Sequence, residues 1–116
     1  MSAAGFRPHP LLRGAHAQTI YPFCIRSRRP PPWENERLEL SDGDFLDLCH
    51  LGSGTGPVVC LFHGLEGCVS SHYVPGLARA LVARGLRVTF MHFRGCSGEP
   101  NRLTRAYHSG DTSDIA

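Results

Sequence analysis

"VVCLFHGLEG", residues 58–67, joins an uninterrupted apolar run to a loop that holds one histidine and two glycines. β-branched and aromatic residues fill its first half, which is typical of a strand buried on both faces of a parallel sheet. We therefore predict a strand over 58–62 and a sharply turning loop directly after it. The stretch leaves open whether His63 is a catalytic base, a metal ligand or a support for the backbone around it.

A helix and a second strand are predicted downstream of this loop. Gly85 stands where a left-handed helix cap belongs. "RVTFMHF", residues 87–93, predicts another buried strand, and strand, helix and strand within ~35 residues form a βαβ unit with a right-handed crossover. The helix, of roughly three turns, is indicated by apolar residues at helical spacing, namely Val74, Leu77, Ala78, Leu81 and Val82.

An antiparallel hairpin is predicted upstream, over 37–51. In "RLELSDGDFLDLCHL" leucines alternate with polar residues on both sides of Asp42-Gly43, and these two residue types tolerate the positive φ of a tight turn. The glycine-rich "GSGTGP", residues 52–57, comes before a strand. A dinucleotide-binding loop comes after a strand and opens a helix, so we interpret 52–57 as a connector.

The two ends of the chain carry weaker patterns. Residues 1–36 are rich in proline and arginine and end in "RSRRPPPWE", so we expect an extended N-terminal arm, followed by one structured region over 37–116. Near the other end, Asp111 and Asp114 resemble the N-cap and acidic first turn of a further helix. A helix that stops after one turn has little stability, so we expect the chain to be truncated.

Composition narrows the class of protein. The 116 residues suffice for one small domain, and 41% apolar with 19% charged residues excludes wholesale disorder. A net charge of +2 is too small to indicate a nucleic-acid partner. The longest apolar runs are about half a dozen residues, whereas a membrane helix needs ~20 and a secretory signal ~7–15. We therefore expect a cytoplasmic protein without a membrane span.

Cysteine usage indicates reduced thiols rather than a disulfide framework, because five cysteines is an odd number and their spacing is irregular. A zinc site would pair Cys60 with His63 and recruit Cys96 or His92. No second short-spaced ligand pair accompanies them, so we expect no metal and no cofactor.

Two loops follow the predicted parallel strands, over 63–72 and 94–102. Ligands bind at the carboxyl ends of such strands in open sheets. Both loops are rich in glycine, so their backbone can turn sharply and present N–H groups to a ligand. An anion or oxyanion pocket is the expected use of these loops.

These motifs resemble a known family. A strand ending in "FHGLEG", a helix, and a strand ending in "FRGCSGEPN" look like the N-terminal part of an α/β-hydrolase fold, in which an antiparallel hairpin precedes a βαβ unit of a mostly parallel sheet. More narrowly, the chain resembles the YheT-like branch, a group described as esterases. The resemblance rests on "AHAQTIYP", "HGLEGCVSSHYVPGLARAL", "FRGCSGEPNR" and "YHSGDTSDI".

The resemblance implies roles for the first loop. The backbone N–H of Leu65 would be one half of the oxyanion hole, and Gly64 would leave room for the substrate; the other N–H comes from the residue after the nucleophile. His63 would support the loop, because it precedes any nucleophile, whereas the family's catalytic histidine comes last in the chain. Three further residues would likewise support the two loops, namely Gly67, Arg94 and Gly95.

The catalytic triad is expected beyond residue 116. The chain has no Gly-x-Ser-x-Gly elbow, since neither Ser97 nor Ser109 has a glycine at the right offset. Typical element lengths put the nucleophile roughly 25–35 residues past Ala116. The remaining candidates are better explained as loop charges or packed side chains, namely Glu66, Cys96, His72 and His108.

The sequence thus implies part of a serine-type carboxylic ester hydrolase that uses an acyl-enzyme and acts on a small-molecule acyl ester. This chain alone would be inactive, lacking nucleophile, acid and base. The alternative is a non-catalytic binding module or a remnant of a hydrolase gene. Half of a parallel sheet exposes unpaired strand edges, so such a module would associate with itself or with a partner.

Overall fold

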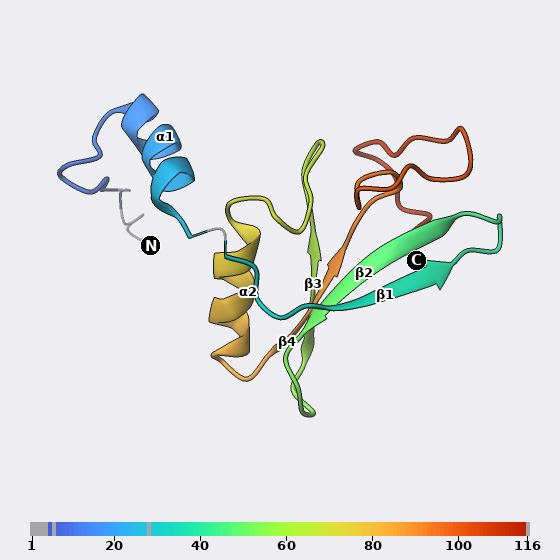
Figure 1. Ribbon diagram of the computed structural model, residues 1–116. Helices are drawn as coiled ribbons and strands as arrows, with labels where there is room; N and C mark the ends of the chain where they lie inside the picture. Colours follow the sequence, from blue (N-terminus) through green and yellow to red (C-terminus); the bar gives the residue numbers. More distant parts are fainter. Residues whose placement is uncertain (1–4, 6, 28, 116) are drawn as a thin grey trace.

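The computed structural model describes residues 5, 7–27 and 29–115. Within them, four strands form one sheet and two helices lie outside it (Figure 1). The order across the sheet is β1-β2-β4-β3, and only β3 and β4 are parallel. The elements are α1 (Ala15–Ile25), β1 (Glu34–Glu39), β2 (Phe45–Leu51), β3 (Val58–Phe62), α2 (Val74–Val82) and β4 (Arg87–Met91).

The predicted hairpin is confirmed. β1 pairs with β2 in a register that sets Glu39 opposite Phe45. Gly43 has φ +88°, and its N–H donates to the Leu40 carbonyl oxygen at 3.0 Å. Glycine adopts this left-handed conformation at no steric cost, so Gly43 allows the reversal that the sequence predicted.

The βαβ unit is also confirmed. β3 and β4 pair in parallel with Cys60 opposite Thr89, and α2 connects them. Gly85, just past the helix, has φ +78°, as predicted for a left-handed cap. α2 packs its buried face on the sheet, where Val74 and Phe90 are fully buried and meet Cys49 of β2. This contact between α2 and the two central strands is the core of the described region.

The prediction that β3 is buried on both faces is wrong. β3 lies at the edge of the sheet, and Val58, Cys60 and Phe62 are exposed on the face that α2 does not cover. Leu61 points to the other face and packs against the core. A continuous apolar run reports the preference of the residues for burial, but burial itself requires a covering element. Within the described residues, α2 covers one face only.

The expected extended arm over 1–36 includes residues 1–4, 6 and 28, which lie outside the described residues; the described part of this range is not one extended arm. α1 occupies 15–25, and β1 already begins at Glu34. The helix stands apart from the sheet in Figure 1 and buries none of its side chains. It therefore lacks the apolar stripe by which a helix is normally detected in a sequence.

The predicted helix at the C-terminal end is not formed within the described residues. Residues 113–115 make a turn, with the Ile115 N–H donating to the Thr112 carbonyl oxygen at 3.1 Å. The carboxylate of Asp111 accepts from Arg105 at 2.6 Å and from the Ser113 hydroxyl at 3.0 Å. Asp114 binds Arg94. Both acidic residues are thus held by side chains instead of capping a helix.

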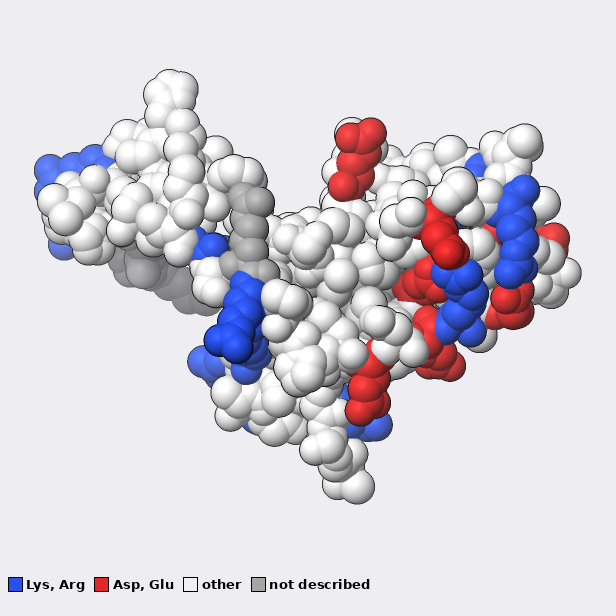
Figure 2. Space-filling view, viewed as in Figure 1, with Lys and Arg blue, Asp and Glu red and all other residues white. Residues whose placement is uncertain are grey.

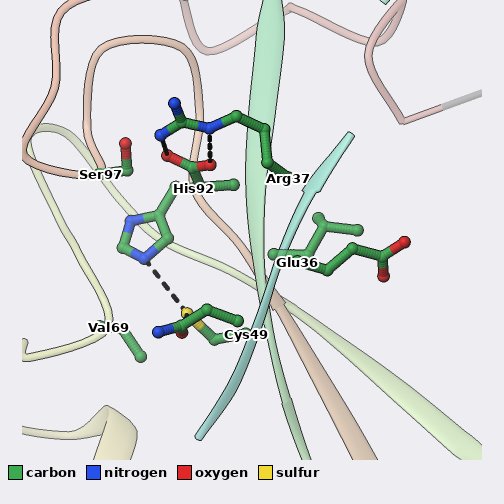
Figure 3. A pocket seen from close by; sticks show the side chains of 9 residues that line it. Glu36, Arg37, Cys49, Val69, His92 and Ser97 are labelled. Atoms are coloured by element: carbon green, nitrogen blue, oxygen red, sulfur yellow. Dashed lines mark hydrogen bonds and ion pairs between the residues drawn. The ribbon is translucent and has the colours of Figure 1, made fainter. Parts of the chain in front are cut away.

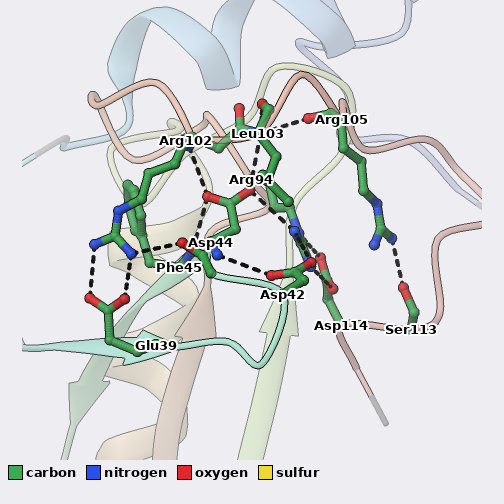
Figure 4. Close-up of polar contacts among 12 residues, drawn as sticks. Glu39, Asp42, Asp44, Phe45, Arg94, Arg102, Leu103, Arg105, Ser113 and Asp114 are labelled. Atoms are coloured by element: carbon green, nitrogen blue, oxygen red, sulfur yellow. Dashed lines mark hydrogen bonds and ion pairs between the residues drawn. The ribbon is translucent and has the colours of Figure 1, made fainter.

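Arg94 ties three segments together (Figure 4). Its guanidinium, only 3% exposed, donates to Asp42 at 2.7 Å, to Asp44 at 3.1 Å and through two nitrogens to Asp114 at 2.8 Å. These contacts join the hairpin turn, the loop after β4 and the C-terminal segment. Truncating one partner of such a buried pair is strongly destabilising, because an uncompensated charge remains.

Asp44 is the most enclosed carboxylate of this cluster, with no exposed surface. It accepts hydrogen bonds from the N–H groups of Phe45 and Arg102 and from the side chains of Asn101 and Arg94. Burial alone would raise its pKa, but these donors favour the charged form and together lower the pKa to about 2. Asp44 is therefore ionised at neutral pH.

Unlike the buried cluster around Arg94, the charged side chains near the hairpin end lie at the surface. Figure 2 shows acidic and basic side chains intermingled there, and ion pairs join Arg37 to Asp47 and Glu99, and Arg102 to Glu39. Such exposed pairs contribute little to stability, because water and salt screen them. The buried cluster around Arg94 is the electrostatic feature that matters for the fold.

We predict that the Asp44 carboxylate makes stability depend on pH. Its pKa in the folded protein lies below its ordinary value of 3.8, so its contribution is fully present at neutral pH and is lost as pH falls from about 4 to about 2. Asp44→Asn should lower the free energy of unfolding at neutral pH, and the difference from the unsubstituted chain should shrink across that window. Urea unfolding at a series of pH values measures it. Glu34→Gln, which changes an exposed carboxylate, is the control. A difference that stays constant with pH contradicts the prediction.

Candidate active site

The loop after β3 opens with a tight turn over 64–67. The Gly67 N–H donates to the Gly64 carbonyl oxygen at 3.0 Å, which closes the turn. At its third position Glu66 has φ +53°, while Leu65 has no positive φ. These are the marks of a type II turn, which normally has glycine or asparagine where Glu66 stands. A non-glycine residue in this conformation persists only where its surroundings hold it.

His63 sits directly before the turn and is buried among three aromatic rings, those of Phe90, Phe93 and Tyr107. Its Nδ1 lies 2.7 Å from the Gly64 carbonyl oxygen, so Nδ1 carries the proton and donates it. Its Nε2 accepts the Phe93 N–H at 3.0 Å. Backbone groups thus occupy both nitrogens, and neither is free to take a substrate proton or bind a metal.

The peptide group between Gly64 and Leu65 is held at its carbonyl end. The Gly64 oxygen accepts from both His63 and Gly67. In a trans peptide the N–H points away from the C=O, so these two bonds also set the direction of the Leu65 N–H.

Of the four consecutive amides from 65 to 68, three have acceptors. Glu66 donates to the Tyr107 hydroxyl at 2.6 Å, Gly67 to Gly64, and Cys68 to the Ser71 hydroxyl at 3.0 Å. In the part of the chain that the structure describes, the Leu65 N–H alone of these four has none. A fixed and unpaired N–H is what an oxyanion site requires.

Tyr107 is a site residue that sequence reasoning missed. Besides holding Glu66, its ring stacks on Phe93, with centroids 5.1 Å apart and planes 6° from parallel. Residue 107 lies in "YHSGDTSDI", which contributed to the family resemblance, but spacing along the chain does not connect it with a turn 41 residues away. The structure brings the two together.

The second glycine-rich loop faces the first across a cavity of about 490 Å³. Residues 66–70, residues 95–98 and His92 line it. Gly95 has φ +77°, and a β-carbon there would lie 3.1 Å from the Asn101 side chain. Another cavity, of about 350 Å³, lies between the turn and the helices and is lined by Phe23, residues 64–68 and residues 70–73. The turn therefore borders two hollows into which a small molecule could fit.

A third cavity, of about 420 Å³, lies beside β1 and β2 and contains a cysteine–histidine pair (Figure 3). Cys49 Sγ lies 3.6 Å from His92 Nε2, and His92 Nδ1 lies 3.2 Å from the Cys96 carbonyl oxygen. Nδ1 must donate to that carbonyl, which leaves Nε2 as an acceptor. Burial raises the pKa of the Cys49 thiol and lowers that of His92, so both are neutral. The pair is no thiolate nucleophile.

The remaining candidates lie apart or are engaged otherwise. The Glu66 side chain is exposed, and the His72 ring meets Phe23 edge-on at 5.3 Å. His108 accepts the Gly110 N–H at 3.1 Å, and Cys96 is half-buried beside the cavity between the loops. Among the described residues, no three histidine, cysteine or acidic side chains are grouped closely enough to bind a metal. Nor is any described helix long and apolar enough to cross a bilayer.

Comparison with known proteins identifies two relatives. The chain is 45% identical to "Putative esterase YheT" of Escherichia coli over an alignment that includes 99% of this chain and 35% of that protein. It is 36% identical to an "Abhydrolase domain-containing protein" of Dictyostelium discoideum, over 62% of this chain and 18% of that protein. The chain thus spans about a third of the first relative and a fifth of the second. No protein-family model matches it, and no solved structure does.

The hairpin, the βαβ unit and the two loops, taken with these relatives, define the N-terminal part of an α/β-hydrolase fold. Within that class the chain is YheT-like, as its motifs indicated.

We predict that the turn depends on Gly67. A β-carbon at this position would lie 2.7 Å from Cβ of His63 and 3.1 Å from the Gly64 carbonyl oxygen. Gly67→Ala should therefore destabilise the chain by about 1–3 kcal/mol, measured by urea unfolding. Gly64→Ala is the matched control, because a β-carbon there meets nothing within 4 Å. Equal effects of the two substitutions would contradict this account of the turn.

Proposed function

We propose that the whole protein containing this chain is a serine-type carboxylic ester hydrolase, and that the turn over 64–67 provides half of its oxyanion hole. The unpaired N–H of Leu65 carries the proposal, because its neighbours are all satisfied and its direction is set through the Gly64 carbonyl. The esterase and hydrolase names of the two relatives support it.

The proposed chemistry is acyl transfer. A serine attacks the ester carbonyl, and the carbonyl oxygen becomes an alkoxide held by two N–H donors, one from Leu65 and one from the residue after the serine. Collapse of this intermediate expels the alcohol and leaves an acyl-enzyme, which water then hydrolyses. Serine, acid and histidine base would come from the rest of the protein. Donors fixed in advance stabilise the alkoxide without having to reorganise.

Four residues would support this arrangement without reacting. His63 orients the Gly64 carbonyl, Gly67 allows the close approach to His63, and Gly95 allows the second loop to turn. Arg94 would fix that loop to the hairpin turn through Asp42 and Asp44. Gly64, with open space around it, would leave room for the ester.

The substrate in this proposal is a small-molecule acyl ester, handled in the cytoplasm without cofactor, metal or nucleic acid. A second candidate is a non-catalytic interaction module or a hydrolase remnant. The exposed apolar side chains of Val58 and Phe62 on the edge strand β3 favour it, because they would suit self-association. Assays of activity separate these candidates.

We expect the protein, at the length of its relatives, to hydrolyse p-nitrophenyl acetate with saturation. Residues 1–116 alone should show no hydrolysis above buffer, because they lack the elbow serine. A burst of product stoichiometric with the 116-residue chain would overturn the role assigned to it. An inactive whole protein would favour the interaction module.

The oxyanion role can be tested at the backbone itself. Leu65 is the second residue of a type II turn, where proline is favoured, so Leu65→Pro should remove the N–H while keeping the turn. In the whole protein, kcat should fall by about 10²–10³-fold. Leu65→Ala shortens the side chain but keeps the N–H, so its kcat should be about 10²-fold higher than that of Leu65→Pro. If the two variants are equally active, Leu65 donates nothing to the oxyanion.

A further inference from the structure

Tyr107 contacts the turn over 64–67 at Glu66, the residue of the turn whose backbone conformation is unfavourable. Its hydroxyl oxygen accepts the Glu66 N–H at 2.6 Å, and Glu66 is the residue with φ +53°. Among the described residues other than glycine, no other has a positive φ. A turn with a positive φ at a non-glycine third residue can relax by rotating the peptide between its two central residues. This rotation turns the N–H of the third residue away. The hydrogen bond to Tyr107 opposes that rotation.

The hydroxyl is itself held in place from two directions. The Tyr107 ring stacks on Phe93 and meets the His63 ring edge-on, with centroids 5.8 Å apart. Phe93 and His63 also share the hydrogen bond that joins the ends of β3 and β4. The ring thus rests on groups that already fix the first half of the turn.

The segment that carries Tyr107 is anchored on both sides. Before it, the Asn101 side chain donates to the Leu103 and Arg105 carbonyl oxygens at 2.8 and 2.6 Å and to Asp44 at 3.2 Å. After it, Asp114 binds the buried Arg94. The position of the hydroxyl is therefore set by the Arg94 cluster and does not depend on a free loop.

We infer that Tyr107 is a positioning residue of the oxyanion hole, which holds the second peptide of the turn while His63 holds the first. The inference rests on the proposed function and adds a residue to it. Tyr107 touches no reacting atom; it keeps the peptide between Leu65 and Glu66 from rotating, which holds the backbone beside the Leu65 N–H in the conformation that the alkoxide would meet. Because that donor acts mainly in the transition state, loss of the hydroxyl should lower kcat more than it changes KM.

The hold of Tyr107 on the Glu66 N–H is tested on the 116-residue chain with Tyr107→Phe, which removes the hydroxyl and keeps the ring. Hydrogen exchange of the Glu66 amide, followed by NMR, should accelerate at least tenfold. The Phe93 amide, which donates to His63, should change little. Tyr21→Phe is the matched control, since Tyr21 lies exposed on α1 and lines none of the cavities around the turn. Unchanged exchange at Glu66 would overturn the inference.

The catalytic consequence is tested in the whole protein with p-nitrophenyl acetate. Tyr107→Phe should lower kcat about tenfold with KM within about twofold, and Tyr21→Phe should leave both constants unchanged. Full kcat in Tyr107→Phe, with an active unsubstituted protein, overturns the inference alone. No hydrolysis by the unsubstituted protein overturns the proposed function and the inference with it. A Tyr107→Phe variant that changes only KM assigns the residue to substrate binding and also overturns the positioning role.

Discussion

The imidazole of His63 connects the parts of this structure that the proposed chemistry needs. One nitrogen accepts the N–H of Phe93 just past β4, and the other donates to the carbonyl of Gly64 just past β3. The parallel pairing of β3 and β4 brings both backbone groups to the same end of the sheet. A single ring therefore fixes the position of the turn relative to the ends of two neighbouring strands. The direction of the Leu65 N–H follows from that carbonyl being held.

The Arg94 cluster provides a second level of support. A buried guanidinium needs carboxylates around it, and here they come from the hairpin turn and from a segment twenty residues further along the chain. Because one of these carboxylates, Asp44, also binds Asn101 and the Arg102 N–H, the cluster organises the whole stretch between β4 and residue 114. This stretch is thus held together by polar contacts, whereas the sheet is held by an apolar core.

Much of the architecture could be predicted from the sequence, because it is encoded locally. The alternation around Asp42-Gly43 gave the hairpin, and the helical spacing that ends at Gly85 gave the βαβ unit. α1 escaped prediction because none of its side chains is buried and the helix has no apolar stripe. The exposure of Val58 and Phe62 also escaped, since burial depends on which elements cover a strand. At the site, the roles expected for His63 and Leu65 came from the family resemblance of the loop after the strand. The contacts of Tyr107 with Glu66 and of the carboxylates with Arg94 arise only in the folded chain, so no local pattern predicts them.

The tautomer of His63 restricts which side chains could take its place. The residue at this position must donate to the Gly64 carbonyl and accept from the Phe93 N–H at the same time, and the two nitrogens of one rigid ring perform these opposite tasks. Lysine and arginine can only donate, and ionised aspartate and glutamate can only accept. The position therefore selects a side chain that carries a donor and an acceptor on different atoms.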